Sequence, residues 1–487
     1  MSERMKCERL QDKVMTADEA ALLVKDGMTV ATSGFTPAGY PKAVPLAVAK
    51  RAENGEQIGL TLITGASVGD ELDGAWARAG VTKRRYPYQT NSFTRNAIND
   101  GKIAYADLHL SQTAFYMKMG YFGKIDLAIV EACEIDEKGH IYPTTSGGIA
   151  NVAVDCADKV IIEVNAAQSL KLKGIHDVYS PKKPPNTEPI PIVTPKDRIG
   201  VPYIECPAEK IAAIVLTDIP DGDAQSSPAD ADQVQMAQNL ITFLKGEVAK
   251  GRMGNNLMPL QSGVGTVANA VLGELAKSDF EHLTIYTEVL QDAVLDLMDA
   301  GKVDFASTTA LTLSKNGKKH FYENIDQYID KIVIRPSELS NNPEVIRRLS
   351  LIGMNTAIEC DIYGNVNSTH IGGTRLMNGI GGSGDFARNS GLVVFFTAST
   401  AKEGTVSSIV PYVTHIDHTE HDVHVIVTEQ GVADLRGLSP VERANAIINN
   451  CAHPKFRPEL QAYLEKALST SKYKHIPHCM SEVFEGK

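Results

Sequence analysis

Clusters of basic residues, long apolar runs and closely spaced cysteines are all missing from this sequence of 487 residues. The formal net charge is -11 and no stripe of Lys and Arg offsets it, which argues against a nucleic-acid partner. No apolar run is long enough to span a membrane, so we expect no membrane partner. The first 28 residues mix acidic and basic side chains, unlike a signal or transit peptide.

The seven cysteines lie far apart and never form a C-x-x-C pair, which disfavours a zinc knuckle or a disulfide framework. They are typical of reduced core thiols, and no cysteine has a recognisable reactive setting. No low-complexity tract is present either, and 43% hydrophobic with 22% charged residues is usual for a folded chain. We therefore expect a soluble, cytoplasmic protein.

Short β-branched runs alternate with helical patterns along the chain. Residues 61–64, 127–130 and 160–164 have the length and composition of buried strands, whereas residues 17–25 read as a helix. Buried strands between helices indicate largely parallel sheets covered by helices. The predicted fold class is therefore α/β.

The chain is too long for one ordinary core, and residues 218–231 have the polar, Pro- and Gly-containing composition of a linker. We predict two α/β domains, residues 1–225 and 226–487. Apolar residues at spacings of three and four over 231–250 predict a long helix that Gly251 ends. An echo between residues 131–141 and 359–369 indicates related halves, with the active site in the cleft between them.

Residues 379–384 read GIGGSG, which formally matches the dinucleotide fingerprint G-x-G-x-x-G. That fingerprint follows an apolar strand, whereas residues 369–378 are polar and rich in glycine. A nicotinamide site is therefore disfavoured. The glycines either let backbone amides approach an oxygen or phosphate closely, or form a plain structural turn.

Residues 65–69 read GASVG and follow a predicted strand, which formally matches a nucleophile elbow at Ser67. An elbow also requires a helix directly behind the serine, and residues 69–74 would start a helix poorly. The spacing assigns no acid and histidine partner. We interpret the motif as a tight turn from strand to loop.

Four histidines at intervals of three, His415, His418, His421 and His424, look at first like metal ligands. A spacing of three does not place ligands well on a helix, and residues 423–427 already have a strand pattern. We interpret these side chains as solvated loop histidines and expect no metal site.

Glu288 lies between a β-rich run and a helical pattern that closes at Gly301. A carboxylate at the carboxyl end of a strand occupies the usual position of α/β active sites, and a helix N-terminus would hold it ionised. Composition alone also allows a plain helix-start residue.

Several motifs along nearly the whole chain resemble those of the acetyl-CoA hydrolase/transferase group of class I CoA-transferases. These motifs are residues 33–39 (SGFTPAG), 259–265 (PLQSGVG), 286–291 (YTEVLQ), 335–343 (RPSELSNNP), 378–386 (NGIGGSGDF), 401–404 (AKEG) and 428–438 (TEQGVADLRGL). The resemblance implies that Glu288 attacks an acyl-CoA thioester and becomes a glutamyl-CoA thioester, which gives ping-pong kinetics. Coenzyme A is then a substrate and covalent intermediate, and no cofactor is tightly bound.

The resemblance also assigns further site residues. It implies that Val264 and Gly382 supply oxyanion-hole amides, that Asn341 and Glu429 border the reacting carboxylates, and that Lys402 meets coenzyme A. It further implies that Gly263, Val264, Gly265, Thr266 and Val267 line the coenzyme-binding loop. The partners would be acyl-CoA and short carboxylates, and a homodimer is implied by analogy.

Three other functions stay open from the sequence. In a hydrolase, water would intercept the glutamyl-CoA thioester with the same residues. A serine esterase would depend on Ser67, and a non-catalytic sensor would bind coenzyme A without exchange. The small side chains at 33–39 and 65–67 suit acetate, propionate or succinate, because a hydrophobic pocket distinguishes one methylene only weakly.

Overall fold

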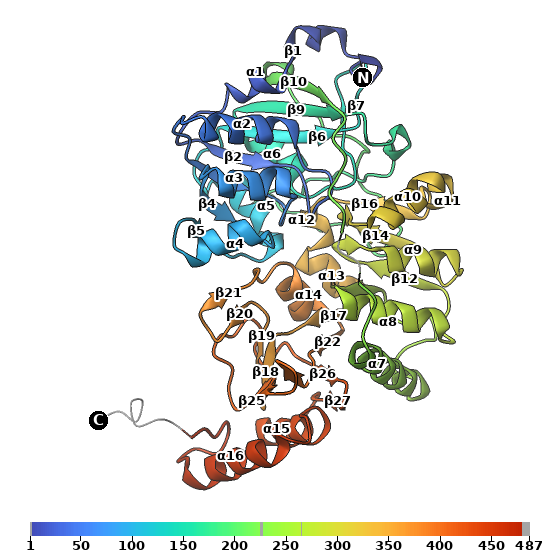
Figure 1. The fold of residues 1–487 in the computed structure, drawn as a ribbon. Helices are drawn as coiled ribbons and strands as arrows, with labels where there is room; N and C mark the ends of the chain where they lie inside the picture. The colour runs from blue at the N-terminus through green and yellow to red at the C-terminus, as the bar shows by residue number, and fades with distance from the viewer. Residues whose placement is uncertain (1, 225–226, 264, 480–487) are drawn as a thin grey trace.

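The computed structural model describes residues 2–224, 227–263 and 265–479, and it contains two large sheets, one in each half of the chain (Figure 1). The first sheet has eight strands, all paired in parallel. Its spatial order is β1 (Val14–Met15), β10 (Ile211–Thr217), β9 (Lys159–Asn165), β6 (Leu127–Ala132), β2 (Thr29–Thr32), β3 (Leu60–Ile63), β4 (Thr82–Tyr86) and β5 (Ala104–Tyr105).

The second sheet also has eight strands, and only the β26–β27 pair is antiparallel within the described residues. Its order is β16 (Ile332–Ile334), β14 (Val303–Thr308), β12 (Leu283–Tyr286), β11 (Leu260–Ser262), β17 (Ile352–Thr356), β22 (Leu392–Phe396), β26 (Val425–Thr428) and β27 (Gly431–Asp434). Read from β26, this order repeats that of the first sheet from β10, and only the edge strands β27 and β1 do not correspond. The α/β class with two related halves is therefore confirmed.

Helices cover both faces of the first sheet because neighbouring strand residues point to opposite sides. Along β6, Leu127 and Ile129 face one core, and Ala128 and Val130 face the other. The first core packs under α1 (Ala17–Ala21), α2 (Ala43–Glu53) and α3 (Ala75–Arg78), and the second under α5 (Leu110–Met119) and α6 (Ala150–Cys156). The predicted strands at 61–64, 127–130 and 160–164 are confirmed as β3, β6 and β9. The helix at 17–25 is shorter than expected.

The second sheet is covered in the same way. One core holds α7 (Ala231–Ala249), α8 (Thr266–Lys277), α9 (Asp292–Asp299), α10 (Lys315–Glu323) and α11 (Ile325–Tyr328), and the other holds α14 (Ser383–Asn389), α15 (Pro440–Asn450) and α16 (Arg457–Thr470). The predicted helix at 231–250 is confirmed as α7, where Asp230 and Gln233 form a capping box. No helix of the described residues is long and apolar enough to cross a membrane.

Several segments connect the two halves. The N–H of Asp177 donates to the carbonyl of Ile334 in β16 over 2.9 Å, and the Asp177 carboxylate forms a buried ion pair with Arg335. The short helix α12 (Ser337–Ser340) follows directly, contacts α5, and precedes α13 (Pro343–Leu349) (Figure 1). The boundary at 225/226 falls on residues outside the described part, so the division into domains 1–225 and 226–487 stays a prediction.

Candidate active site

Glu288 lies directly beyond the carboxyl end of β12, where the backbone makes a bend before the short strand β13 (Val289–Leu290). Its carbonyl oxygen accepts hydrogen bonds from the backbone amides of Thr309 (3.0 Å) and Ala310 (3.1 Å). β13 pairs in parallel with β15 (Ala310–Leu311). The predicted position at a strand end is therefore confirmed, but the helix α9 begins only at Asp292, so Glu288 is not a helix-start residue.

The Glu288 carboxylate is half-buried and closely surrounded. The side-chain amide of Asn341 donates a hydrogen bond of 2.7 Å to Oε2. A Cβ atom built on Gly382 would lie 1.8 Å from the same oxygen, so any side chain at position 382 would displace the carboxylate. Glu288, Asn341 and Gly382, which the resemblance named separately, are thus brought together.

The expectation that a helix dipole holds Glu288 ionised is wrong for this geometry. Burial raises the pKa of Glu288 to about 7, and the hydrogen bond from Asn341 only partly opposes that rise. A perturbed carboxyl in a cavity is typical of a functional site, because its protonation state changes near neutral pH.

Two cavities of different character border Glu288. A cavity of about 340 Å³ has mainly small and apolar walls, namely Phe35, Thr36, Pro37, Ala66, Ser67, Tyr88, Thr90, Leu110, Asp223, Ala224, Gly265, Glu288, Val289, Gln291 and Thr312. A cavity of about 180 Å³ is more polar and is lined by Tyr88, Gly263, Glu288, Asn355, Thr356, Ser368, Asn378, Gly379, Ile380, Gly381, Gly382 and Ser383. Glu288 therefore borders both an apolar chamber and a glycine-rich polar one. Both chambers take residues from the two halves of the chain.

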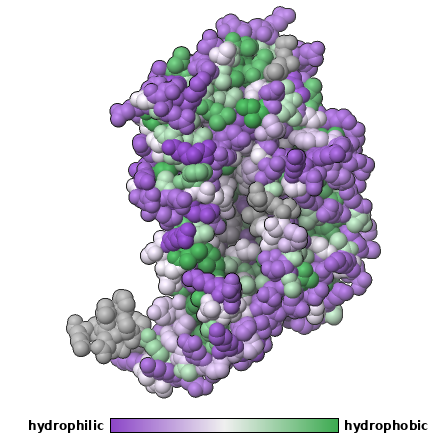
Figure 2. Space-filling view, in the orientation of Figure 1, coloured by the Kyte–Doolittle hydropathy of each residue, from purple (hydrophilic) through white to green (hydrophobic). Residues whose placement is uncertain are grey.

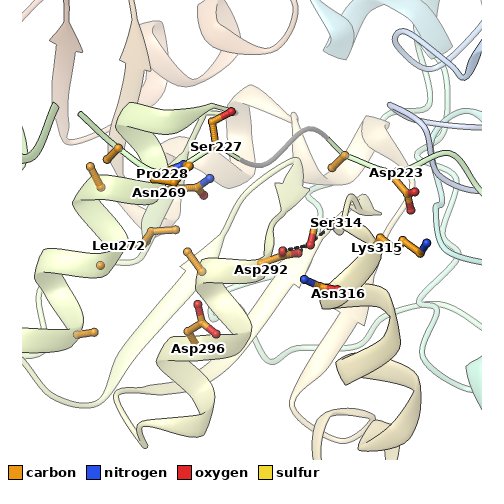
Figure 3. A pocket seen from close by; sticks show the side chains of 16 residues that line it. Asp223, Ser227, Pro228, Asn269, Leu272, Asp292, Asp296, Ser314, Lys315 and Asn316 are labelled. Carbon is orange, nitrogen blue, oxygen red and sulfur yellow. Dashed lines mark hydrogen bonds between the residues drawn. The ribbon is translucent and has the colours of Figure 1, made fainter.

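A larger groove of about 840 Å³ lies beside the apolar chamber and shares Asp223 and Ala224 with it (Figure 3). It runs over α8, α9 and the start of α10. Asp223, Asp292 and Asp296 contribute negative charge to its walls, against the positive charge of Lys315. An excess of carboxylates disfavours phosphate groups, so volume alone does not mark this groove as the site of an anionic ligand.

The loop before α8 reaches both chambers next to Glu288. Gly263 lines the polar chamber and Gly265 the apolar one, and Gly265 has a φ of +115° that L side chains rarely adopt. Gln291 fixes the loop: its Nε2 donates to the Gly263 carbonyl (3.1 Å), and its Oε1 accepts from the Gly265 amide (3.3 Å). Thr266 and Val267 open α8. Val264 lies outside the described residues.

Neither Lys402 nor Glu429 is among the residues that line the two chambers. Lys402 is exposed in the turn between β23 (Thr400–Ala401) and β24 (Val406–Ser407). Glu429 follows β26, where its carboxylate accepts hydrogen bonds from the Ser399 amide (2.9 Å) and the Gln430 side chain (3.0 Å). Burial raises the pKa of Glu429, but these hydrogen bonds outweigh it and the net shift is downward. Contacts of Lys402 and Glu429 with substrate stay predictions.

The segment that follows Ser67 differs from expectation in one respect. A π-helical turn at Asp70–Gly74 does follow Ser67 and continues into α3, because Leu72 and Trp76 bury against α2. Among the described residues no hydrogen bond joins Ser67 to a histidine, and Ser67 instead lines the apolar chamber.

The histidines of residues 415–424 do not all face solvent. His418 is fully buried, where it packs against the ring of Phe395 and lies 3.2 Å from the hydroxyl of Ser383. The expectation of a solvated loop histidine is therefore wrong for His418, whereas His421 is exposed. Within the part of the chain that the structure describes, no group of three His, Cys, Asp or Glu side chains could hold a metal ion.

Three residues near Glu288 were not singled out from the sequence. Tyr88 lines both chambers, and burial raises its pKa to about 12. Asp107 accepts a hydrogen bond of 2.6 Å from the Ile380 amide, and Asp385 follows the glycine-rich turn. Only Asp385 lay within a quoted motif, residues 378–386, so its place in that motif was the available signal.

The fold is shared with solved structures of low sequence identity. RipA from Yersinia pestis superimposes with a TM-score of 0.71 at 24% identity, covering 93% of this chain and 97% of that chain. The 4-hydroxybutyrate CoA-transferase from Porphyromonas gingivalis gives 0.66 at 22% identity, covering 94% and 99%. The fold is thus the two-domain α/β fold found in CoA-transferases.

Family comparison narrows this class. The N-terminal domain of acetyl-CoA hydrolase/transferase matches residues 1–216, and its C-terminal domain matches residues 317–464. Succinyl-CoA:acetate CoA-transferase of Clostridium kluyveri is 53% identical over 96% of this chain and 87% of its own length. Propanoyl-CoA:succinate CoA transferase of Escherichia coli is 44% identical (97% and 96%), and acetyl-CoA hydrolase of Neurospora crassa is 43% identical (99% and 95%). The chain belongs to the acetyl-CoA hydrolase/transferase family of enzymes.

Proposed function

We propose that this enzyme transfers coenzyme A between a short-chain acyl-CoA and a free carboxylate, with Glu288 as the covalent nucleophile. The observation that carries the proposal is the half-buried Glu288 carboxylate between two chambers, with Asn341 on one oxygen and the Gly382 backbone against it. The names of relatives at 53% and 44% identity support the same reaction class.

The reaction would proceed through two acyl transfers at Glu288. A Glu288 oxygen attacks the thioester carbonyl, the C–S bond breaks, and coenzyme A leaves as a thiolate while an acyl-glutamyl anhydride forms. The thiolate then attacks the glutamyl carbonyl and expels the first carboxylate, which leaves a glutamyl-CoA thioester. A second carboxylate reverses these steps, so bonds and charge balance without a tightly bound cofactor.

Each step passes through a tetrahedral oxyanion, which needs donors aimed in advance. The Asn341 amide is already aimed at Glu288, and the backbone of Gly382 lies against the carboxylate. By resemblance the Val264 and Gly382 amides would serve as the oxyanion hole, while Glu429 would border the reacting carboxylates. The loop from Gly263 to Val267 and the side chain of Lys402 would bind coenzyme A.

The apolar chamber is the proposed site of the acyl group. Its volume of about 340 Å³ and its small side chains suit acetyl, propionyl or succinyl groups. The glycine-rich polar chamber on the other side of Glu288 would receive the thiol end of coenzyme A, since backbone amides suit an approaching oxygen or sulfur.

Borohydride trapping tests the covalent step. The protein is incubated with acetyl-CoA, propionyl-CoA or succinyl-CoA, reduced, and weighed intact and as peptides. We expect a mass change confined to the peptide that contains Glu288, absent in Glu288→Gln and retained in Glu281→Gln, where an exposed glutamate of the same half is changed. Normal turnover by Glu288→Gln would overturn the mechanism.

Hydrolysis is the second candidate function. The Neurospora crassa relative named acetyl-CoA hydrolase is 43% identical to this chain, and the Escherichia coli transferase is 44% identical. Water would then attack the same glutamyl-CoA thioester. Thiol release from acetyl-CoA that does not change with added acetate, propionate or succinate would favour hydrolysis. Formation of the matching new acyl-CoA would favour transfer.

We further propose a cytoplasmic homodimer. The seven cysteines form no disulfide in the described structure, which suits a reducing compartment. Figure 2 shows a mainly hydrophilic face with scattered hydrophobic patches. Light scattering on the purified protein gives the mass that decides the oligomeric state.

A further inference from the structure

The glycine-rich turn at residues 378–383 lines the polar chamber beside Glu288, yet a segment of the first half holds its backbone. That segment, residues 105–110, runs from the end of β5 to the start of α5. More than 260 positions of sequence separate it from the turn. The wall of the polar chamber therefore depends on contacts across the boundary between the two halves.

Asp107 makes the shortest of these contacts. Its Oδ2 accepts a hydrogen bond of 2.6 Å from the backbone amide of Ile380. The Tyr105 hydroxyl lies 3.2 Å from Oδ1 of Asp107 and 3.2 Å from the carbonyl oxygen of Asn378, so its proton can serve both acceptors. A hydrogen bond to a carboxylate is stronger than one between neutral groups, which makes Asp107 the main anchor of the turn.

A third contact sets the direction of one amide. The Leu110 amide donates to the carbonyl of Gly381 over 3.4 Å. That carbonyl and the N–H of Gly382 belong to one planar peptide unit, in which they point in opposite directions. Holding the Gly381 carbonyl therefore also directs the Gly382 amide, and Gly382 is the residue whose backbone lies against the Glu288 carboxylate.

The turn has no free space on the side of Asp107. A Cβ atom built on Gly379 would lie 2.4 Å from the Tyr105 hydroxyl and 2.7 Å from Oδ1 of Asp107. A Cβ atom on Gly381 would lie 3.2 Å from the ring of Tyr88. Because the turn is held between first-half side chains on one side and Glu288 on the other, a displacement of the Asp107 contact would be transmitted to Gly382.

We propose that Asp107 is a positioning residue for the reaction at Glu288. It holds the Ile380 amide, and with the Leu110 contact this fixes the peptide planes that direct the Gly382 amide. This inference rests on the proposed function, in which the Gly382 amide stabilises the oxyanion. Because Gly382 lies against Glu288 throughout, formation and consumption of the Glu288 thioester should depend on Asp107 to the same degree.

The first test compares two substitutions of Asp107 by the exchange of labelled acetate into acetyl-CoA. Asp107→Ala leaves the Ile380 amide without its acceptor, and we expect kcat/KM to fall by about tenfold or more. Asp107→Asn removes the charge but keeps a side-chain oxygen for the same amide, so its kcat/KM should stay within about threefold of the unchanged protein. Borohydride trapping should show formation and consumption of the Glu288 thioester slowed together in Asp107→Ala.

A second test perturbs the turn from its own side. Gly379→Ala places a methyl group against Tyr105 and Asp107, so the turn must move and kcat/KM should fall by about tenfold or more. In a Tyr105→Phe, Asp107→Ala background both close atoms are absent, and the nearest remaining contact is Tyr88 at 3.1 Å. The same substitution should then lower kcat/KM by about threefold or less. This non-additivity reports the position of the turn.

Each outcome decides for or against the assignment. Asp100→Asn changes an exposed aspartate at the end of the preceding helix and should leave kcat/KM unchanged. A loss under threefold in Asp107→Ala, equal losses in Asp107→Ala and Asp107→Asn, or an additive effect of Gly379→Ala would each overturn the positioning role. These results leave the Glu288 adduct of the unchanged protein in place. Absence of that adduct would instead overturn the proposed function, and this inference with it.

Discussion

Asn341 donates its side-chain amide to Oε2 of Glu288 across 2.7 Å, although 53 residues separate the two in sequence. Replacing Asn341 with Ala removes a hydrogen bond to a charged group, which is worth about 1.5–3 kcal/mol, so we expect kcat/KM to fall about 10- to 100-fold. Because this hydrogen bond lowers the pKa of Glu288, its loss raises that pKa further. The acidic limb of the pH–rate profile should therefore move to higher pH.

The neighbouring Asn342 provides the control for that variant. Its side-chain oxygen caps α13 by accepting from the Glu344 amide over 3.0 Å, so Asn342→Ala should cost about 1 kcal/mol of stability. Its pH–rate profile should keep the position found in the unchanged enzyme. A shifted profile in Asn342→Ala, or an unshifted one in Asn341→Ala, would contradict the assigned role.

Glu288 should also reduce the stability of the fold above neutral pH. An unfolded glutamate ionises near pH 4.3, whereas burial raises the pKa of Glu288 in the folded protein to about 7. Between these values the folded state retains a proton that the unfolded state has lost, so this group's contribution to stability falls as pH rises to about 7. We expect Glu288→Gln to unfold at a higher temperature than the unchanged protein at pH 8.

That difference in unfolding temperature should shrink steadily towards pH 5, which calorimetry across the range can measure. Glu281→Gln removes a charge at an exposed position and controls for the altered net charge. An equal or lower unfolding temperature for Glu288→Gln at pH 8 would show that burial of the Glu288 carboxylate does not destabilise the fold.

Leu110 limits the apolar chamber, where it packs with Phe35, Ala66 and Val289. Leu110→Ala would enlarge the chamber, and each additional buried methylene contributes about 0.8 kcal/mol, or roughly fourfold in kcat/KM. We expect the ratio of butyryl-CoA to acetyl-CoA turnover to increase in this variant. The exposed Leu46→Ala serves as the control, and an unchanged ratio in Leu110→Ala would place the acyl group elsewhere.

Patterns over a few neighbouring residues predicted the strands and helices whose burial or capping is already visible in such a short stretch of sequence. The strands β6 and β9 are buried along almost their whole length, and α7 has both an apolar spacing and a capping box. Glu288 was recognisable because a strand end is visible in the sequence. Its raised pKa was not, since that depends on burial between two chambers.

Other features depend on how the two halves pack, which no periodicity encodes. The contacts of Ser111 with Asp385 and of Asp107 with Ile380 join residues more than 270 positions apart. The burial of His418 depends instead on packing within the second half, against Phe395 of β22. All of these contacts join residues that no local pattern connects, so they could be found only in the structure.

Lys42 is fully buried between two carboxylates, Glu131 at 2.5 Å and Asp221 at 2.8 Å. Burial lowers the pKa of Lys42, but attraction to Asp221 and Glu131 outweighs it and the net shift is upward. Lys42→Met would leave two buried carboxylates without a cation, and breaking a buried pair in this way typically costs about 3–5 kcal/mol. Asp221 precedes the wall residues Asp223 and Ala224 of the apolar chamber, so we also expect weaker acyl-CoA binding. Urea unfolding measures the change in the free energy of unfolding.

Lys50→Met is the control, because Lys50 forms only an exposed ion pair, with Asp18 at 3.8 Å. The free energy of unfolding of this variant should stay within about 0.5 kcal/mol of that of the unchanged protein. Similar losses in the two variants would mean that the buried cluster adds no more to stability than a surface ion pair.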